Sequence, residues 1–469
     1  MKKCLTLLLA LTLCGPAAAT SEPPHPLMLD EVLDAALKAF PGLLAAEQRK
    51  QAAAGEYQTA EGGFDTTLKL QNRWSVAGIY ENQNYDVNIE QPTPFGGTTF
   101  FGGWRRGTGD YPVYKGKSKT AEGGEVRIGV NIPLWRNREI DRRRASLQQA
   151  ELGQLIASHE YDQALLELRR LATHRYWDWV LAGQRLRITE RLLAIAEQRN
   201  DGILERVKAG DIPEFEALDN QRAIIERRER RVAAQRLLEQ SAIQLSLYLR
   251  GTDGEPLLPD SGQLPPGFPE QEPAVETDLA ENVQVAQTQR PELKRMGLQS
   301  RQTEIERDLQ NNQRAPGVDL SVVGAQDMGQ SKDKLNRDEL YIGLNVDIPL
   351  QQRVAGGRAQ VAAANLQRLK WERRLLEDRV AAEVRDVLSA IAAARQRVAL
   401  SRNQQKAARQ LEEGEQSRFD LGESTLLVVN LREMAHGDAA LAAAEAASAL
   451  FKAHADYQAV LGNQIRLPE

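Results

Sequence analysis

The chain has 469 residues, a formal net charge of −5 at pH 7 and only two cysteines, Cys4 and Cys14. Because acidic residues outnumber basic ones, a nucleic-acid partner is disfavoured. After residue 19 there is no run of about eighteen apolar residues, which excludes a membrane-spanning helix but not a membrane strand, whose sequence signal is much weaker.

The first residues have the order of a secretory signal peptide. Lys2-Lys3 precede an apolar run, which ends in Gly15-Pro16-Ala17-Ala18-Ala19, so we expect residues 1–19 to be removed by cleavage after Ala19. The alternative, a lipid on Cys14, is disfavoured because Leu13 occupies a position where lipoprotein signals need a small residue. Both cysteines lie in this segment, so the mature chain has no disulfide and no cysteine metal site, which fits a bacterial envelope protein.

The remaining chain is an internal duplication. Four short matches recur in the same order, at spacings of 250, 254, 216 and 212 residues: Pro41-Gly42-Leu43 with Pro291-Glu292-Leu293, Phe64-Asp65 with Val318-Asp319, Ile132-Pro133-Leu134 with Ile348-Pro349-Leu350, and Arg206-x-x-x-Gly210 with Arg418-x-x-x-Gly422. Residues 251–275 hold six of the twenty prolines and predict an irregular connector. We therefore divide the chain into a first repeat, 20–250, the connector, 251–275, and a second repeat, 276–469.

Strands are predicted by alternation of apolar and polar residues. The pattern covers 64–76 and 126–132 in the first repeat and 318–323 and 341–348 in the second. The first repeat has 38 extra residues before Val126, which alternate over 85–90 and 98–104 and predict an additional hairpin. The strands therefore lie within 64–134 and 318–350, and their number is four or six.

Long helices are predicted after each strand set. Residues 139–249 and 355–462 each form a helical hairpin, and an unbroken helix over 139–208 has a length of roughly 105 Å. In the second repeat, Val384, Val387, Ile391, Ala394 and Val398 follow Val380 at the spacing of a coiled-coil seam.

Two basic segments lie in or next to these helices. The basic segment 135–144 either pairs with Glu139 and Asp141 or contacts lipid headgroups. In contrast, 225–231, IERRERR, predicts a solvated helix face with Glu226 and Glu229 as local partners.

No catalytic or cofactor site is predicted. The five histidines show no metal-ligand spacing, there is no Gly-x-Ser-x-Gly motif, and acidic pairs lie in heavily charged helices. We therefore expect neither an enzyme nor a bound cofactor or metal. Aromatic residues, however, are concentrated: eleven of 25 fall in 64–135. A soluble sandwich core and the interfacial girdles of a membrane barrel both produce such a bias, and the girdles explain it better.

Apolar-out strands surrounded by lipid must belong to a closed sheet, and four or six strands are too few for a bacterial barrel of at least eight. Several copies of the chain must therefore share one barrel. The duplicated strand sets, the long helical hairpins and the two Arg-x-x-x-Gly turns together resemble the TolC-type outer membrane efflux proteins over essentially all of 27–465.

The resemblance implies a mixed α/β membrane protein in the outer membrane of a Gram-negative bacterium. It implies a homotrimer whose β-barrel continues as a periplasmic α-helical barrel. It also implies a function as the exit duct of a tripartite efflux or type I secretion system, with a periplasmic adaptor and an inner membrane pump as partners. The chief alternative is a non-conducting coiled-coil scaffold or adaptor of the envelope.

The resemblance and the alternation together place two sets of site residues. Those of the periplasmic tips, which dock the adaptor and form the gate, are Arg206, Gly210, Asp211, Arg418, Gly422, Glu423, Thr425 and Asn430. Those facing the barrel lumen are Arg127, Asn131, Asn345 and Asp347. Glycine is expected to end each long helix in a left-handed conformation, and the arginine side chain to bond the last free carbonyls. One departure concerns the Thr-Leu-Leu-Asp-x-x-Asp run of the family, which here reads TLLVVNL (425–431) without aspartate.

Overall fold

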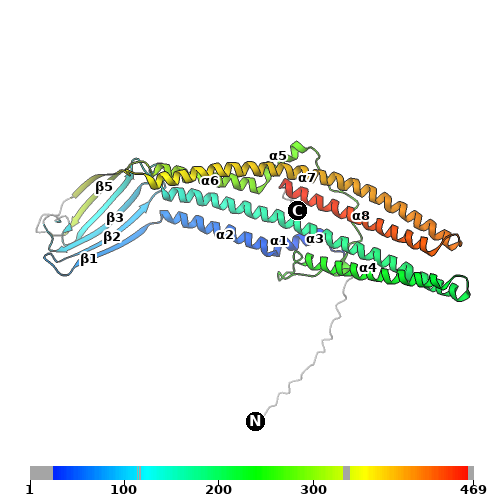
Figure 1. Ribbon diagram of the computed structural model, residues 1–469. Helices are drawn as coiled ribbons and strands as arrows, with labels where there is room; N and C mark the ends of the chain where they lie inside the picture. Colours follow the sequence, from blue (N-terminus) through cyan, green and yellow to red (C-terminus); the bar gives the residue numbers. More distant parts are fainter. Residues whose placement is uncertain (1–24, 113–114, 116–117, 331–337, 463–469) are drawn as a thin grey trace, which may run out of the picture. The chain divides into compact units, whose positions relative to one another are not determined.

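The computed structural model describes residues 25–112, 115, 118–330 and 338–462. The predicted signal peptide, 1–19, lies outside these residues. Helices predominate, and the strands form one sheet (Figure 1). No helix in the described part of the chain combines the length and apolar character needed to cross a membrane.

The helices follow the same order in each half of the sequence: two shorter helices, the strands, a long helix and a returning helix. In the first half these helices are α1 (Leu29–Ala39), α2 (Pro41–Glu61), α3 (Arg142–Ala209) and α4 (Glu214–Ser246), with a 3-10 turn, η1 (Gly62–Phe64), after α2. In the second half they are α5 (Leu279–Gln289), α6 (Pro291–Asn312), α7 (Arg353–Asp420) and α8 (Leu426–Leu461). Both α3 and α7 have 68 residues. The matched order agrees with a duplicated unit.

Six strands form one antiparallel sheet in the order of the sequence. They are β1 (Thr67–Ser75), β2 (Asn82–Pro92), β3 (Thr99–Gly109), β4 (Gly124–Pro133), β5 (Gly317–Met328) and β6 (Asp338–Asp347). The two halves join where β4 pairs with β5. The extra residues of the first half form β2 and β3, so the number of strands is six rather than four. The predicted start of the first strand at Phe64 is wrong, because Gly62–Phe64 is a 3-10 turn and β1 begins at Thr67.

The chain divides into two compact units, each built from segments of both halves. Among the described residues, the first unit comprises 25–35, 175–271 and 401–448, and its core includes the fully buried Trp179, Val180 and Leu245. The proline-rich connector belongs to this unit and contains a short 3-10 turn, η3 (Ser261–Gln263).

The second unit comprises the described residues within 36–174, 272–400 and 449–462 and contains the six-stranded sheet. The predicted seam of α7, Val380 to Val398, is buried at every one of its six positions, each 8% exposed or less. The 4-3-4-3-4 spacing therefore identified the buried stripe of this helix.

Candidate functional site

One face of the sheet is apolar and exposed. Residues opposite each other in the register project to the same face, and one row of partners crosses all six strands: Leu68, Ile89, Gly102, Ile128, Gly324 and Leu340. Ile128 is 72% exposed and Leu340 is 70% exposed. Water-soluble proteins bury side chains of this kind. The exposed apolar row therefore identifies a face that needs an apolar environment.

The opposite face is polar and is crosslinked by ion pairs. A guanidinium nitrogen of Arg127 donates to both carboxylate oxygens of Asp86 at 2.8 Å, reaching from β4 to β2, and Lys69 pairs with Glu90 at 2.5 Å. The side chain of Arg127 is only 26% exposed. Around this ion pair the sheet thus reverses the pattern of a water-soluble sheet, since Arg127 and Asp86 are less exposed than Ile128 and Leu340 on the other face.

The four residues predicted to face a lumen lie on this polar face. Arg127 pairs in register with Ala325, Asn131 with Ser321, and Asn345 with Asp319. Asp347 lies at the end of β6, where Arg136 donates to its carboxylate at 2.6 Å. Alternation in the sequence therefore placed all four on one side of the sheet.

Both Arg-x-x-x-Gly sequences end a long helix in the same way. After α3, the amide of Gly210 donates to the carbonyl of Val207 at 3.0 Å, and that of Asp211 donates to the carbonyl of Arg206 at 2.9 Å. Gly210 has φ of 80°, in the left-handed region. These two hydrogen bonds with a left-handed residue between them define a Schellman motif. Glycine is required here because a side chain is disfavoured at this φ.

The second turn, after α7, repeats the motif. Gly422 has φ of 78°, its amide donates to Phe419 at 3.0 Å, and the amide of Glu423 donates to Arg418 at 2.8 Å. A Cβ added at either glycine meets no atom within 4 Å. The conformation alone therefore selects glycine at both turns.

The predicted role of the arginine side chain is wrong at the second turn. A guanidinium nitrogen of Arg418 donates to the carbonyl of Glu423 at 3.2 Å, beyond the helix, rather than to the last carbonyls of α7. The backbone motif already supplies amide donors to carbonyls in the last turn, including that of Arg418 itself. At the first turn no side-chain bond of Arg206 is found in the described structure. What the two turns share at the arginine position is therefore the backbone carbonyl of Arg206 or Arg418, which accepts the hydrogen bond that closes the turn.

The run that follows the second turn begins α8. The carbonyl of Thr425 accepts from the amides of Val428 and Val429 at 3.1 and 3.2 Å, which starts the helix. Asn430, a predicted gate residue, accepts through its side-chain oxygen from Arg227 of α4 at 3.2 Å. The Asn430 side chain is therefore engaged within the chain.

Comparison with protein-family models and with curated proteins finds no match. Solved structures match with probability 1.00 over 92% of this chain. The Campylobacter jejuni CmeC outer membrane channel has a TM-score of 0.66 and 14% identity, with 85% of that chain covered. The open-state Neisseria gonorrhoeae MtrE outer membrane channel has a TM-score of 0.67 and 16% identity, with 88% of that chain covered. The Vibrio cholerae outer membrane protein VceC has a TM-score of 0.64 and 15% identity, with 96% of that chain covered.

The chain has the TolC-type channel fold. The resemblance inferred from the sequence is therefore confirmed at the level of the fold. Among the described residues, no group of three or more histidine, aspartate or glutamate side chains could hold a metal ion.

Within this TolC-type fold, sequence reasoning missed a buried ion cluster that joins α3, α4 and α8. Glu433 is 2% exposed and Arg227 is 3% exposed, and they pair at 2.7 Å. Arg199 pairs with the other carboxylate oxygen of Glu433, and Arg227 also donates to the carbonyl of Leu192 at 2.6 Å. The expectation that residues 225–231 form a wholly solvated face is thus wrong for Arg227. Three charges are buried together because each has a partner.

The sequence carried one weak signal of this cluster. Ile224 and Arg227 are spaced like neighbours on one helix face, and Ile224 packs in a buried cluster with Leu193 and Ala196. An arginine on that apolar stripe needs a buried carboxylate. The four arginines of the segment look alike in the sequence, however, and Glu433 lies about two hundred residues away.

Proposed function

We propose that this chain is an outer membrane channel of a Gram-negative bacterium. It serves as the exit duct of a tripartite efflux or type I secretion system. The observation that carries the proposal is the reversed sheet, in which one exposed apolar face crosses six strands while the opposite face is charged. Lipid outside and water inside satisfy both faces, since each leucine or isoleucine removed from water contributes about 1.5–3 kcal/mol.

Closure of the sheet requires further copies of the chain. β1 and β6 are the two edges of the sheet, and edge strands in lipid leave backbone groups unpaired. Six antiparallel strands place β1 and β6 in opposite directions, so β6 of one copy can pair with β1 of the next in the same antiparallel pattern. Three copies with six strands each give a barrel of eighteen strands. The homotrimer is the assembly that the TolC-type fold supports.

The two Schellman turns would then form the periplasmic tips. Beside them, the exposed Phe215, Leu218 and Leu427 line a cavity of about 550 Å³ together with Asp219 and Arg222. Apolar side chains rimmed by charges are typical of a protein docking surface. We infer that a periplasmic adaptor binds here and connects the duct to an inner membrane pump.

The alternative is a non-conducting coiled-coil scaffold or adaptor of the envelope. Such a protein uses long helices in the same way but has no need for a sheet with an exposed apolar face. The sheet therefore favours the channel.

Bilayer recordings of the purified chain test the channel directly. We expect stepwise ion conductance in planar bilayers, together with slower gel migration of the unheated assembly than of the heated chain. Ile128→Arg introduces a charge on the apolar face, which costs about 2–4 kcal/mol at the bilayer midplane. It should reduce insertion into the outer membrane, whereas Asn131→Arg on the polar face of the same strand should not. An inserted wild-type assembly without conductance would support the scaffold, and equal insertion of the two variants would refute the assignment of the faces.

A further inference from the structure

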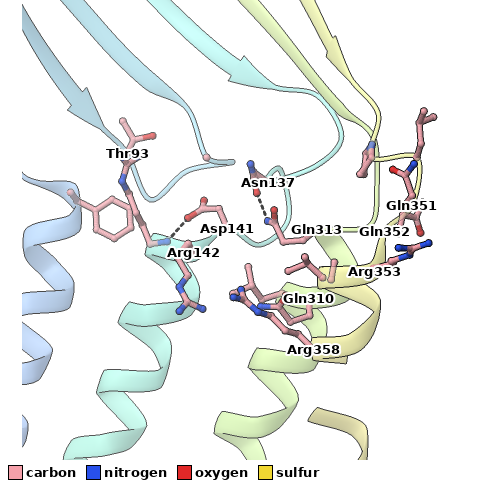
Figure 2. Close-up of a pocket in the computed structure, with 18 residues that line it drawn as sticks. Thr93, Asn137, Asp141, Arg142, Gln310, Gln313, Gln351, Gln352, Arg353 and Arg358 are labelled. Carbon is pink, nitrogen blue, oxygen red and sulfur yellow. Dashed lines mark hydrogen bonds between the residues drawn. The ribbon is translucent and has the colours of Figure 1, made fainter. Parts of the chain in front are cut away.

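A large cavity lies in the second unit where the strands end and the long helices begin. It has a volume of about 1020 Å³ and is bordered by the starts of α3 and α7, the end of α6 and the β2–β3 turn (Figure 2). Asn137 fixes this border: its amide donates to the side-chain oxygen of Asn312 at 2.8 Å, and its own side-chain oxygen accepts from Gln313 at 2.6 Å. At Gly97 of the β2–β3 turn, an added Cβ would come within 2.5 Å of the carbonyl oxygen of Asn137. The border is therefore closely packed.

The lining of this cavity is strongly basic. Its charged residues are Asp141, Arg142, Arg143, Arg353 and Arg358, so four arginines and one aspartate give a formal net charge of +3. The whole chain has a net charge of −5. No carboxylate partner of Arg143, Arg353 or Arg358 is found among the described residues, and Arg142 is 3.5 Å from Glu306 with 70% of its side chain exposed. The cavity thus concentrates positive charge without an equal number of acidic partners.

The helix ends at the cavity add to this charge. A helix N-terminus carries a partial positive charge and favours acidic residues in the first turn. Such residues are present in α1, α4, α5 and α6 and absent from α2, α3, α7 and α8. Of the four helices without them, α3 and α7 are the two that begin with arginine. Arginine at these positions destabilises the helix end unless an anion is nearby.

The two helix starts differ in their capping. Asp141 caps α3, accepting from the amides of Arg143 and Arg144 at 2.8 and 3.0 Å, and it also pairs with the Arg144 side chain at 2.6 Å. Before α7, Gln352 has φ of 51°, and no side-chain acceptor caps the helix in the described structure. The first amides of α7 are therefore available to an acceptor oxygen from the cavity.

We propose that this cavity binds an anionic group of the phosphate class. Arg353 and Arg358 hold it from α7, and Arg142 and Arg143 hold it from α3, because a guanidinium matches phosphate oxygens in a bidentate manner. The anion neutralises the two helix starts. Its source is the headgroup of an anionic phospholipid or a phosphate-bearing solute. The first source rests on the proposed function, which places the end of the apolar sheet face at the membrane surface.

Binding to the purified mature chain in neutral detergent tests the proposal. Calorimetric titration with inorganic phosphate measures the affinity for a free phosphate-bearing solute. Native mass spectrometry measures the affinity for a lipid headgroup, as the retention of phosphatidylglycerol relative to phosphatidylcholine. The test variant is Arg353→Gln with Arg358→Gln. The control is Arg379→Gln with Arg385→Gln, which removes the same charge from two other exposed positions of α7.

We expect the test variant to weaken binding of at least one probe by roughly tenfold or more, and the control to change it by less than about twofold. Binding of the free phosphate should also weaken with added salt. Loss confined to phosphatidylglycerol identifies the lipid source, and loss confined to phosphate identifies the solute source. Equal behaviour of the two double variants with both probes overturns the inference. Conductance is measured separately, so a chain that binds phosphate but does not conduct refutes only the proposed function.

Discussion

The buried cluster around Glu433 predicts that neutralising one carboxylate destabilises the first unit. Glu433→Gln keeps the shape of the side chain but leaves the charges of Arg199 and Arg227 without their partner. Breaking a buried ion pair in this way costs about 3–5 kcal/mol. In a folding unit of 150–250 residues each kcal/mol lowers the thermal midpoint by about 2–4 °C, so a decrease of about 6–20 °C is expected.

Circular dichroism at 222 nm during heating measures this midpoint in the purified chain. The control is Glu226→Gln on α4, whose partner Arg230 is 2.8 Å away in an exposed pair, and which should cost less than about 1 kcal/mol. Arg227→Met combined with Glu433→Met should recover part of the loss, because removing both partners leaves one fewer unpaired charge. The reasoning is refuted if Glu433→Gln melts within about 2 °C of the control.

Three further predictions concern the same fold. Gly210→Val with Gly422→Val should leave membrane-inserted protein at normal levels but abolish export, since a β-branched residue is strained at positive φ; loss of the inserted protein itself would contradict this. Burial lowers the pKa of His454, opposed by its bond to Glu272, so stability should be complete above pH of about 6.5 and fall as the pH drops through the folded-state pKa. The thermal midpoint should therefore fall less on acidification in His454→Gln than in the wild type, and equal slopes would exclude this residue as a cause. Asn430→Asp should raise the free energy of unfolding by about 1 kcal/mol, and with it the thermal midpoint, because a carboxylate binds Arg199 and Arg227 more strongly than an amide does. A lower thermal midpoint would show that the cost of desolvating the carboxylate dominates.

Alternation and helical spacing were sufficient to predict strands whose two faces differ in polarity and the helix α7, which has one buried apolar stripe. Ile128 and Asn131 lie on opposite faces of the sheet because successive side chains of a strand alternate. This alternation follows from the backbone and does not depend on whether lipid or water contacts either face. The two turn glycines were also found from sequence, since their φ is a local requirement. The strand limits were less certain: β5 continues to Met328, beyond the predicted 318–323, because Gly324 and Gln326 break the apolar pattern while the backbone pairing with β4 continues.

The contacts between distant segments could not be predicted from local patterns. Arg227 and Arg228 are adjacent and chemically identical, yet the first is buried against Glu433 and the second pairs with Glu197 at 2.6 Å on the exposed surface. Only the position of α8 distinguishes them. For the same reason the sequence left two partners open for the basic segment before α3. The structure pairs Arg144 with Asp141, whereas Arg142 and Arg143 lie at the cavity.

The meander of six strands also has a consequence for how such a chain can change. The first half contributes four strands and the second half two. The last strand of each half nevertheless finishes at the same end of the sheet, and a long helix begins after it. Insertion of one hairpin adds an even number of strands, so it preserves the parity of up and down directions and leaves both helix starts where they were. The width of the sheet can therefore be altered by gain or loss of a hairpin, independently of the helical hairpins that follow it.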